Sequence, residues 1–139
     1  MKRLSAIVAA VFVACGASGP EIVYQDTAPI EDIYVWLDAT TQVLIEVLDK
    51  HTAEAVMDVY IRVYAEDHEF NGLDNTIGLY YPELDLIMVR RLGDSVQDTA
   101  LPHEIFEHRL PHILTGEPNR DHADYWHEFG TNLARMVGQ

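Results

Sequence analysis

The chain of 139 residues is predicted to fold as one small α+β domain, with a three-stranded sheet and about three helices. Two observations predict this class. First, apolar residues recur at helical spacing in three stretches of the chain. Second, the short runs between the first and the second stretch either alternate apolar and polar residues or are bounded by turn residues, as β-strands are. Helices placed around strands in this way pack on the sheet and bury its apolar faces.

The first helix is predicted over residues 30–50, where apolar side chains recur every three or four residues and Pro29 precedes the start. Residues 55–64 alternate apolar and polar side chains and predict a half-buried strand. A turn at Pro82-Glu83 suits a hairpin, because proline is poorly placed inside a ladder. The hairpin strands are predicted over residues 77–81 and 84–90, after a polar loop over residues 65–76.

Two further helices are predicted in the C-terminal third. Ser95 or Asp94 can cap a helix that runs to residue 115, and Gly116 with a following proline is a typical helix stop. Apolar residues at helical spacing then predict a last helix over residues 122–137.

The N-terminus has the features of an export signal. Residues 1–14 begin with Met1, Lys2 and Arg3 and continue with a run of 11 residues that is apolar apart from Ser5 and too short to span a bilayer. Cys15 follows the sequence Phe-Val-Ala, which resembles the lipobox of bacterial lipoproteins, where acyl chains on the cysteine anchor the protein. We therefore predict a lipoprotein signal over residues 1–14, a flexible tether over residues 15–29 and a folded domain over residues 30–139.

Composition excludes several classes of function. The net charge of −14 argues against binding to nucleic acid and against docking on anionic lipid, so contact with a membrane is expected through the lipid anchor only. A single cysteine rules out an intrachain disulfide. Neither a phosphate-binding glycine pattern nor a setting for a serine or cysteine nucleophile is recognisable.

Ligand-type side chains are concentrated in one stretch of the chain. Five of the seven histidines lie between residues 103 and 127, and ten residues contain three of them together with two glutamates. These five are His103, Glu104, Glu107, His108 and His112. Imidazole and carboxylate groups are the ligands of zinc-class ions, so the sequence predicts a metal site here.

The order of motifs resembles that of the zincin metallopeptidases, and more closely the small exported zincin-like proteins of bacteria. The hairpin GLYYPELDLIMV precedes His103-Glu104, the start of an HExxH motif, and the loop Thr-Gly-Glu-Pro over residues 115–118 comes before a further histidine, His122. This resemblance implies a zincin-like fold, a bound zinc ion, Glu104 as the general base and a peptide or protein substrate.

The second ligand departs from that pattern, because Glu107 stands where the family has histidine and His108 comes one residue later. A one-residue π-bulge could bring His108 beside His103, and such bulges concentrate at functional sites. Alternatively, Glu107 is itself the ligand. A third possibility uses His108 with His112, four residues apart, with Glu104 or Glu107 nearby.

The spacing of 14 residues from His108 to His122 agrees with the family, so we predict His103, His108 and His122 as metal ligands. Glu107 is then a substitute ligand or a partner that orients one. Three functions follow: a lipid-anchored zinc hydrolase of the bacterial envelope acting on a peptide bond, a non-catalytic metal- or partner-binding lipoprotein, and a metal-free binding module.

Overall fold

The computed structural model describes residues 19–70 and 76–138, and within them the chain forms one four-stranded sheet with the order β1-β2-β4-β3. The strands are β1 (Glu21–Gln25), β2 (Tyr60–Tyr64), β3 (Gly78–Tyr81) and β4 (Leu86–Arg90). β1, β2 and β4 are parallel neighbours, whereas β3 pairs with β4 in the antiparallel direction. β3 is therefore an edge strand.

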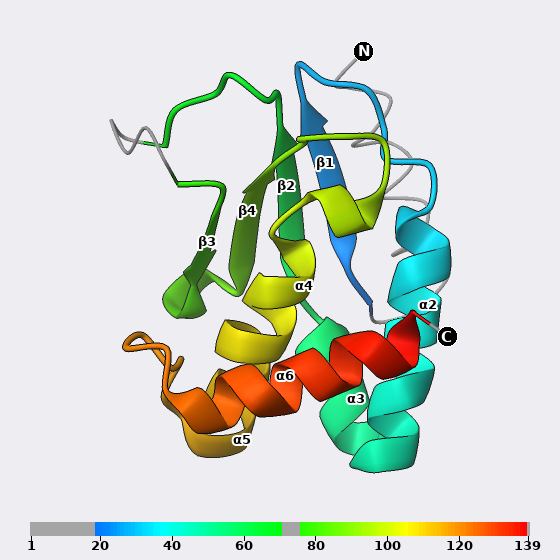
Figure 1. Ribbon diagram of the computed structural model, residues 1–139, viewed down its shortest axis with the longest axis vertical. Helices are drawn as coiled ribbons and strands as arrows, with labels where there is room; N and C mark the ends of the chain where they lie inside the picture. The colour runs from blue at the N-terminus through cyan, green and yellow to red at the C-terminus, as the bar shows by residue number, and fades with distance from the viewer. Residues whose placement is uncertain (1–18, 71–75, 139) are drawn as a thin grey trace.

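Four helices accompany the sheet in the described residues, and the third changes its pitch along its length. The first, second and fourth are α2 (Ile33–Val47), α3 (Lys50–Met57) and α6 (Asp124–Val137). The third is one continuous helix made of α4 (Leu101–His103), a π-helix (Glu104–Arg109) and α5 (Leu110–Thr115). Figure 1 shows α4 in front of the sheet, between the strands and α6, with α6 crossing the lower part of the molecule. Short 3₁₀ turns cover Pro82–Leu84 and Val96–Asp98.

Every second side chain of the three parallel strands points into the core. In register across the three parallel strands, Ile22, Ile61 and Ile87 form one buried row, and the next inward row contains Val63 and Val89. Each such side chain stabilises the fold by about 1.5–3 kcal/mol on leaving water. The buried helix residues pack against these rows, which places the third helix directly on the sheet.

The sheet has four strands because residues 21–25 pair with β2, although the sequence predicted them to be part of a flexible tether. The prediction of a three-stranded sheet was therefore wrong by one strand. Glycine and proline before residue 21 indicated a linker, but β-propensity depends on context, and the parallel ladder to β2 decides the outcome. The parallel arrangement requires a long crossover, which α2 and α3 provide.

The predicted first helix is divided in two. Leu48 leaves the helical conformation, and Asp49 then caps α3 by accepting a hydrogen bond of 2.7 Å from the Thr52 amide. Consequently residues 55–57, predicted to begin a strand, belong to α3, and the strand starts at Tyr60. The aspartate followed three residues later by Thr52 was a helix-start signal in the sequence.

The hairpin of β3 and β4 and the helix stop at Gly116, which has a φ of 84°, confirm two predictions. Ser95 caps only a 3₁₀ turn, and the motif helix begins later, at Leu101. The last helix begins at Asp124, so His122 lies in the preceding loop and not on a helix as predicted.

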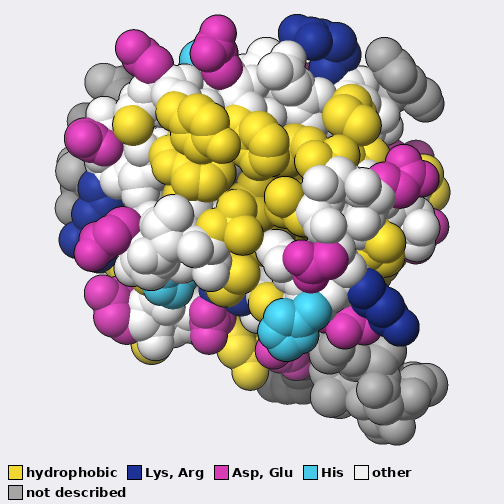
Figure 2. All heavy atoms as spheres, turned by 90° about the horizontal axis from the view of Figure 1, so that it is seen from below, with side chains coloured by type: hydrophobic (Ala, Val, Ile, Leu, Met, Phe, Trp, Pro, Cys, Tyr) yellow, Lys and Arg dark blue, Asp and Glu magenta, His cyan; other side chains and the backbone are white. Residues whose placement is uncertain are grey.

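Residues 1–14 and Cys15 lie outside the described part of the chain. In the part that is described, no helix has the length and apolar character needed to cross a membrane. Apolar side chains do gather on the lower face of the molecule (Figure 2). Among the exposed apolar side chains, Leu114 lies on α5, and Tyr125 and Met136 lie on α6.

Candidate metal centre

The helix that carries the motif becomes a π-helix over Glu104–Arg109. The Leu110 amide donates to the Ile105 carbonyl, five residues earlier instead of four. In a regular α-helix, residues five apart face about 140° away from each other, so His103 and His108 would point in different directions. The wider π turn accommodates the additional residue and brings the two rings to the same side. The predicted irregularity is confirmed.

Three histidine rings converge beside this π-helix. The Nε2 atoms of His103 and His108 are 3.1 Å apart, and the His122 ring centroid lies 5.5 Å from that of His103 and 4.8 Å from that of His108. One ring nitrogen from each residue lies within 4.8 Å of the other two. Nitrogens bound to one tetrahedral zinc ion are about 3.3 Å apart, so small side-chain rotations would seat an ion.

Two of the rings are already oriented. Nδ1 of His108 lies 3.0 Å from the Pro118 carbonyl, which can only accept, so Nδ1 carries the proton. Nδ1 of His103 lies 3.1 Å from the Glu107 carboxylate, which holds that ring in the same tautomer. Both Nε2 lone pairs then face each other across 3.1 Å. A cation between them would satisfy both, so the donor set fits a metal ion.

Burial supports the neutral form of the central ligand. His108 is 9% exposed, and desolvation lowers its pKa, with the nearby His103 and His122 acting in the same direction and the Pro118 contact opposing them. Metal binding requires a neutral imidazole, so this environment keeps His108 ready for coordination near neutral pH.

The third histidine of the group, His122, is carried by a loop that is hydrogen-bonded to the π-helix. The Asn119 side chain donates to the Glu107 carbonyl at 3.0 Å and accepts from the Ala123 amide at 2.7 Å. Pro111, four residues after Glu107, has no N–H to donate to that carbonyl, so the asparagine supplies the missing donor. His122 itself has a φ of 58° and is exposed.

Sequence reasoning did not identify Asn119 as part of the site. Its signal was indirect: a proline inside a helical stretch leaves a carbonyl four residues earlier without an α-helical donor. Asn119 is only 7% exposed, and its own φ of 51° is a conformation that asparagine tolerates better than most residues.

Glu104, which follows His103 in the chain, is a buried carboxyl group. Its side chain is 5% exposed, and burial first, with the neighbouring Glu107 second, raises its pKa from 4.5 to about 8. β3 approaches it closely at Gly78, where a Cβ atom would lie 3.1 Å from the Glu104 carboxyl oxygen and 2.6 Å from the Ala100 Cβ. Glycine at this position therefore leaves the space that Glu104 occupies.

Glu107 is not part of the group that could hold an ion in the described residues. Its carboxylate contacts Nδ1 of His103, the ring atom that faces away from the proposed ion, and it also contacts His127. Of the roles predicted for Glu107, this geometry supports the partner that orients a ligand. It gives no support to the role of substitute ligand.

His112 and Arg109 point to other partners. Nδ1 of His112 lies 2.6 Å from the Tyr80 hydroxyl, so the pairing of His108 with His112 is not observed. Arg109 is 2% exposed and donates to the Tyr80 hydroxyl and to Asp85. It also donates to three carbonyls at the end of α3, those of Ala55, Val56 and Asp58.

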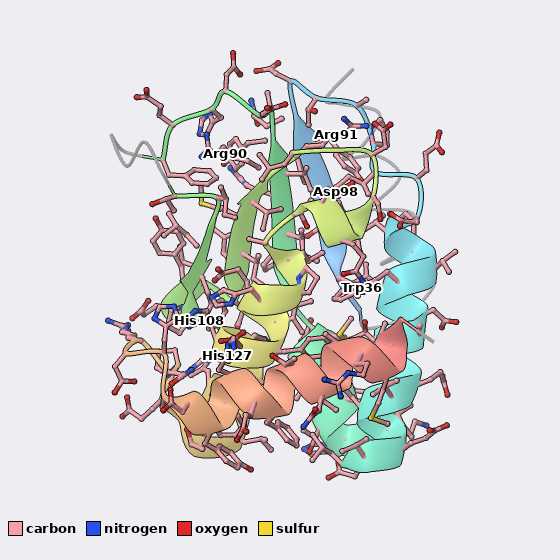
Figure 3. All side chains as sticks on the ribbon, in the orientation of Figure 1. Trp36, Arg90, Arg91, Asp98, His108 and His127 are labelled. Carbon is pink, nitrogen blue, oxygen red and sulfur yellow. The ribbon has the colours of Figure 1, made fainter. Side chains whose placement is uncertain are left out.

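A cavity of about 890 Å³ opens over the histidines. Its lining includes His103, Glu104 and His108 of the motif helix, β3 with the residues before it, and His122 of the following loop. Figure 3 shows His108 beside β3 and the π-helix, with His127 close by at the start of α6. The candidate centre is thus reached from solvent along an exposed sheet edge.

No model of a known protein family matches the chain, and no curated protein or solved structure does either. The resemblance to zincins therefore remains a prediction. What the chain does has to be inferred from its own geometry.

Proposed function

We propose that this chain is a zinc-dependent hydrolase that acts on a peptide bond. The observation that carries the proposal is the convergence of His103, His108 and His122 on one point in the lining of an open cavity. Three protein ligands with room for a fourth is the arrangement of catalytic zinc sites, whereas structural sites are closed by four protein ligands. When bound, a zinc ion would supply a Lewis acid and lower the pKa of water in the cavity.

Glu104 would serve as the general base. It lines the same cavity as the three ligands, and no other carboxylate among the lining residues lies on the motif helix. It would take the proton from the attacking water and return it to the leaving amine. Burial holds its pKa near 8 without a cation, and a positive charge held by the three imidazoles would favour the ionised form at neutral pH.

The edge strand suits an extended peptide. The Arg90 amide of β4 donates to the Ile77 carbonyl at 3.0 Å, and antiparallel pairing alternates, so the main-chain groups of Gly78 and Tyr80 point away from β4. A substrate strand added to this edge would run beside the histidines. This supports a peptide in preference to a small ester or phosphate substrate.

One observation favours a non-catalytic alternative. Glu104 is almost fully buried, and it packs against Gly78. If this side chain stays protonated with metal present, the protein would bind zinc without turnover. In that case the ion acts as a structural link between the π-helix and the loop of His122.

The proposed location is the bacterial envelope, with Cys15 as the site of a lipid anchor. The basic and apolar residues 1–14 support it, as set out from the sequence. Mass spectrometry of membrane-extracted protein would test it, since acylation at Cys15 adds the mass of the lipid and Cys15→Ser abolishes it.

The test of function is metal content followed by peptide cleavage. Untagged protein purified without chelator is expected to contain one zinc ion per chain and to cleave peptides from a mixed library. Glu104→Gln should retain the zinc and lose activity by at least about a hundredfold, as expected of a general base. Glu128→Gln, an exposed carboxylate on α6, is the matched control. Zinc without cleavage would select the non-catalytic alternative, and no zinc would reject both.

A further inference from the structure

Glu107 receives contacts from two histidines on different elements. Its Oε2 atom lies 3.1 Å from Nδ1 of His103 on the motif helix. Both of its carboxylate oxygens lie 3.2 Å from Nδ1 of His127 on α6. Glu107 is 7% exposed, whereas the His127 side chain is 66% exposed, so this chain of contacts runs from the cavity to the surface on the other side of the helix.

The packing of α6 depends on a glycine at this point. A Cβ atom at Gly130 would lie 3.2 Å from Cγ of Glu107 and 3.0 Å from Cβ of Phe106. Without that Cβ, α6 lies close enough for His127, one turn earlier, to reach the Glu107 carboxylate. The packing of α6 on the π-helix therefore places His127 within reach of Glu107.

The inserted residue has a consequence for the ligand set. In a regular HExxH helix, three residues separate the two ligand histidines. Here four residues separate His103 from His108, and Glu107 is the last of them. A carboxylate on the outer nitrogen of a ligating imidazole fixes its tautomer and its orientation, and increases its basicity. His103 needs such a partner because its ring is only partly buried.

We propose that Glu107 is a positioning residue that holds the His103 ring with Nε2 toward the metal, and that His127 keeps the Glu107 carboxylate in place. This inference rests on the metal-binding part of the proposed function and not on peptide cleavage. Loss of such a partner lowers metal affinity by about 10- to 100-fold.

The experiment measures zinc affinity of the full chain by competition with a chromophoric chelator. Glu107→Ala should bind zinc about 10- to 100-fold more weakly than the wild type. Glu107→Gln should lie between the two, because its amide oxygen still accepts one N–H. His127→Ala should weaken binding by less than Glu107→Ala. Glu128→Ala, which removes an equal charge from the exposed face of α6, is the matched control and should be unchanged.

Two readouts separate positioning from folding. The unfolding free energy of the metal-free proteins in urea reports any general damage, and His127→Ala, an exposed position, keeps the test informative if Glu107→Ala does not fold. The visible spectrum of the Co²⁺ form should change in Glu107→Ala and be partly restored in Glu107→Gln, since it follows the geometry of the ligands.

Each result has a distinct meaning. Zinc affinities of Glu107→Ala and His127→Ala within about twofold of the wild type would overturn the positioning role while leaving the metal site intact. A wild type that binds no zinc would overturn the proposed function and this inference together. Normal zinc binding and positioning with no peptide cleavage would retain the inference and reject only the hydrolase.

Discussion

His108 and Arg109, consecutive residues of the π-helix, belong to two polar clusters that differ in how completely their polar groups are paired. Every donor group of the Arg109 guanidinium has a partner in the protein, with three main-chain carbonyls, Tyr80 and Asp85 around it. The cluster around His108 is incomplete, since the Nε2 atoms of His108 and His103 face each other and Glu104 is buried with a raised pKa. A complete cluster stabilises the fold, whereas an incomplete one leaves polar groups that a ligand could satisfy.

The largest expected effect lies in the complete cluster. Arg109→Met should lower the free energy of unfolding by about 3–5 kcal/mol, because loss of the buried guanidinium leaves one buried and two partly buried carbonyls at the end of α3 without their donor. Urea unfolding measures it, with Arg135→Met on the exposed face of α6 as the control. A loss below about 1 kcal/mol would show that water replaces the guanidinium and that the two clusters do not differ as argued.

The incomplete cluster should make the free energy of unfolding of the metal-free protein depend on pH. The folded-state pKa of Glu104, about 8, lies above its ordinary value of 4.5, so its stabilising contribution is full below pH 4.5 and is lost as pH rises through 8. In the metal-free protein this slope approaches about 1.4 kcal/mol per pH unit at most. Comparing urea unfolding of wild type and Glu104→Gln between pH 5 and 8 isolates it. Parallel curves for the two proteins would contradict the buried, uncompensated position of Glu104.

Asn119 connects the π-helix to the loop of His122, because it donates to the Glu107 carbonyl and accepts from the Ala123 amide. Asn119→Ala should lower the free energy of unfolding by about 1–3 kcal/mol and also weaken zinc binding, since the third ligand loses its anchor. Asn132→Ala, an exposed asparagine on α6, serves as the control for urea unfolding and for zinc competition. Unchanged zinc affinity would mean that the loop is positioned by other contacts.

The smallest expected effect on stability belongs to His122, a proposed metal ligand. His122 has a φ of 58°, which glycine adopts without cost, so His122→Gly should leave the metal-free protein as stable as the wild type or up to about 1 kcal/mol more stable. The same change should abolish the stabilisation that zinc gives the wild type. His122→Asn, which tolerates this conformation and lacks the imidazole, should also lose the zinc effect. Thermal unfolding with and without zinc measures both, and zinc stabilisation in either variant would remove His122 from the ligand set.

Local chemistry predicted the irregular helix better than it predicted the sheet. The additional residue between His103 and His108 made a π-bulge one of three possibilities, and the π-helix over Glu104–Arg109 is the one observed. The strand at residues 21–25 was missed, since it forms through pairing with a segment 39 residues later in the register Glu21 to Tyr60. Neighbouring residues do not encode such a pairing.

Asn119 and Arg109 show a second limit. Each satisfies main-chain carbonyls that helix irregularities and helix ends leave free, and such needs become visible only when the helix bounds are known. The role of Arg109 at the end of α3 depends on residues more than fifty places earlier in the chain.

X-ray absorption at the zinc edge of the loaded protein tests the central claim most directly, because it counts the imidazole ligands. The account predicts three imidazole nitrogens at roughly 2.0–2.1 Å, with oxygen completing the shell. Two imidazoles with an added carboxylate, or a six-coordinate ion held mainly by oxygen, would contradict it.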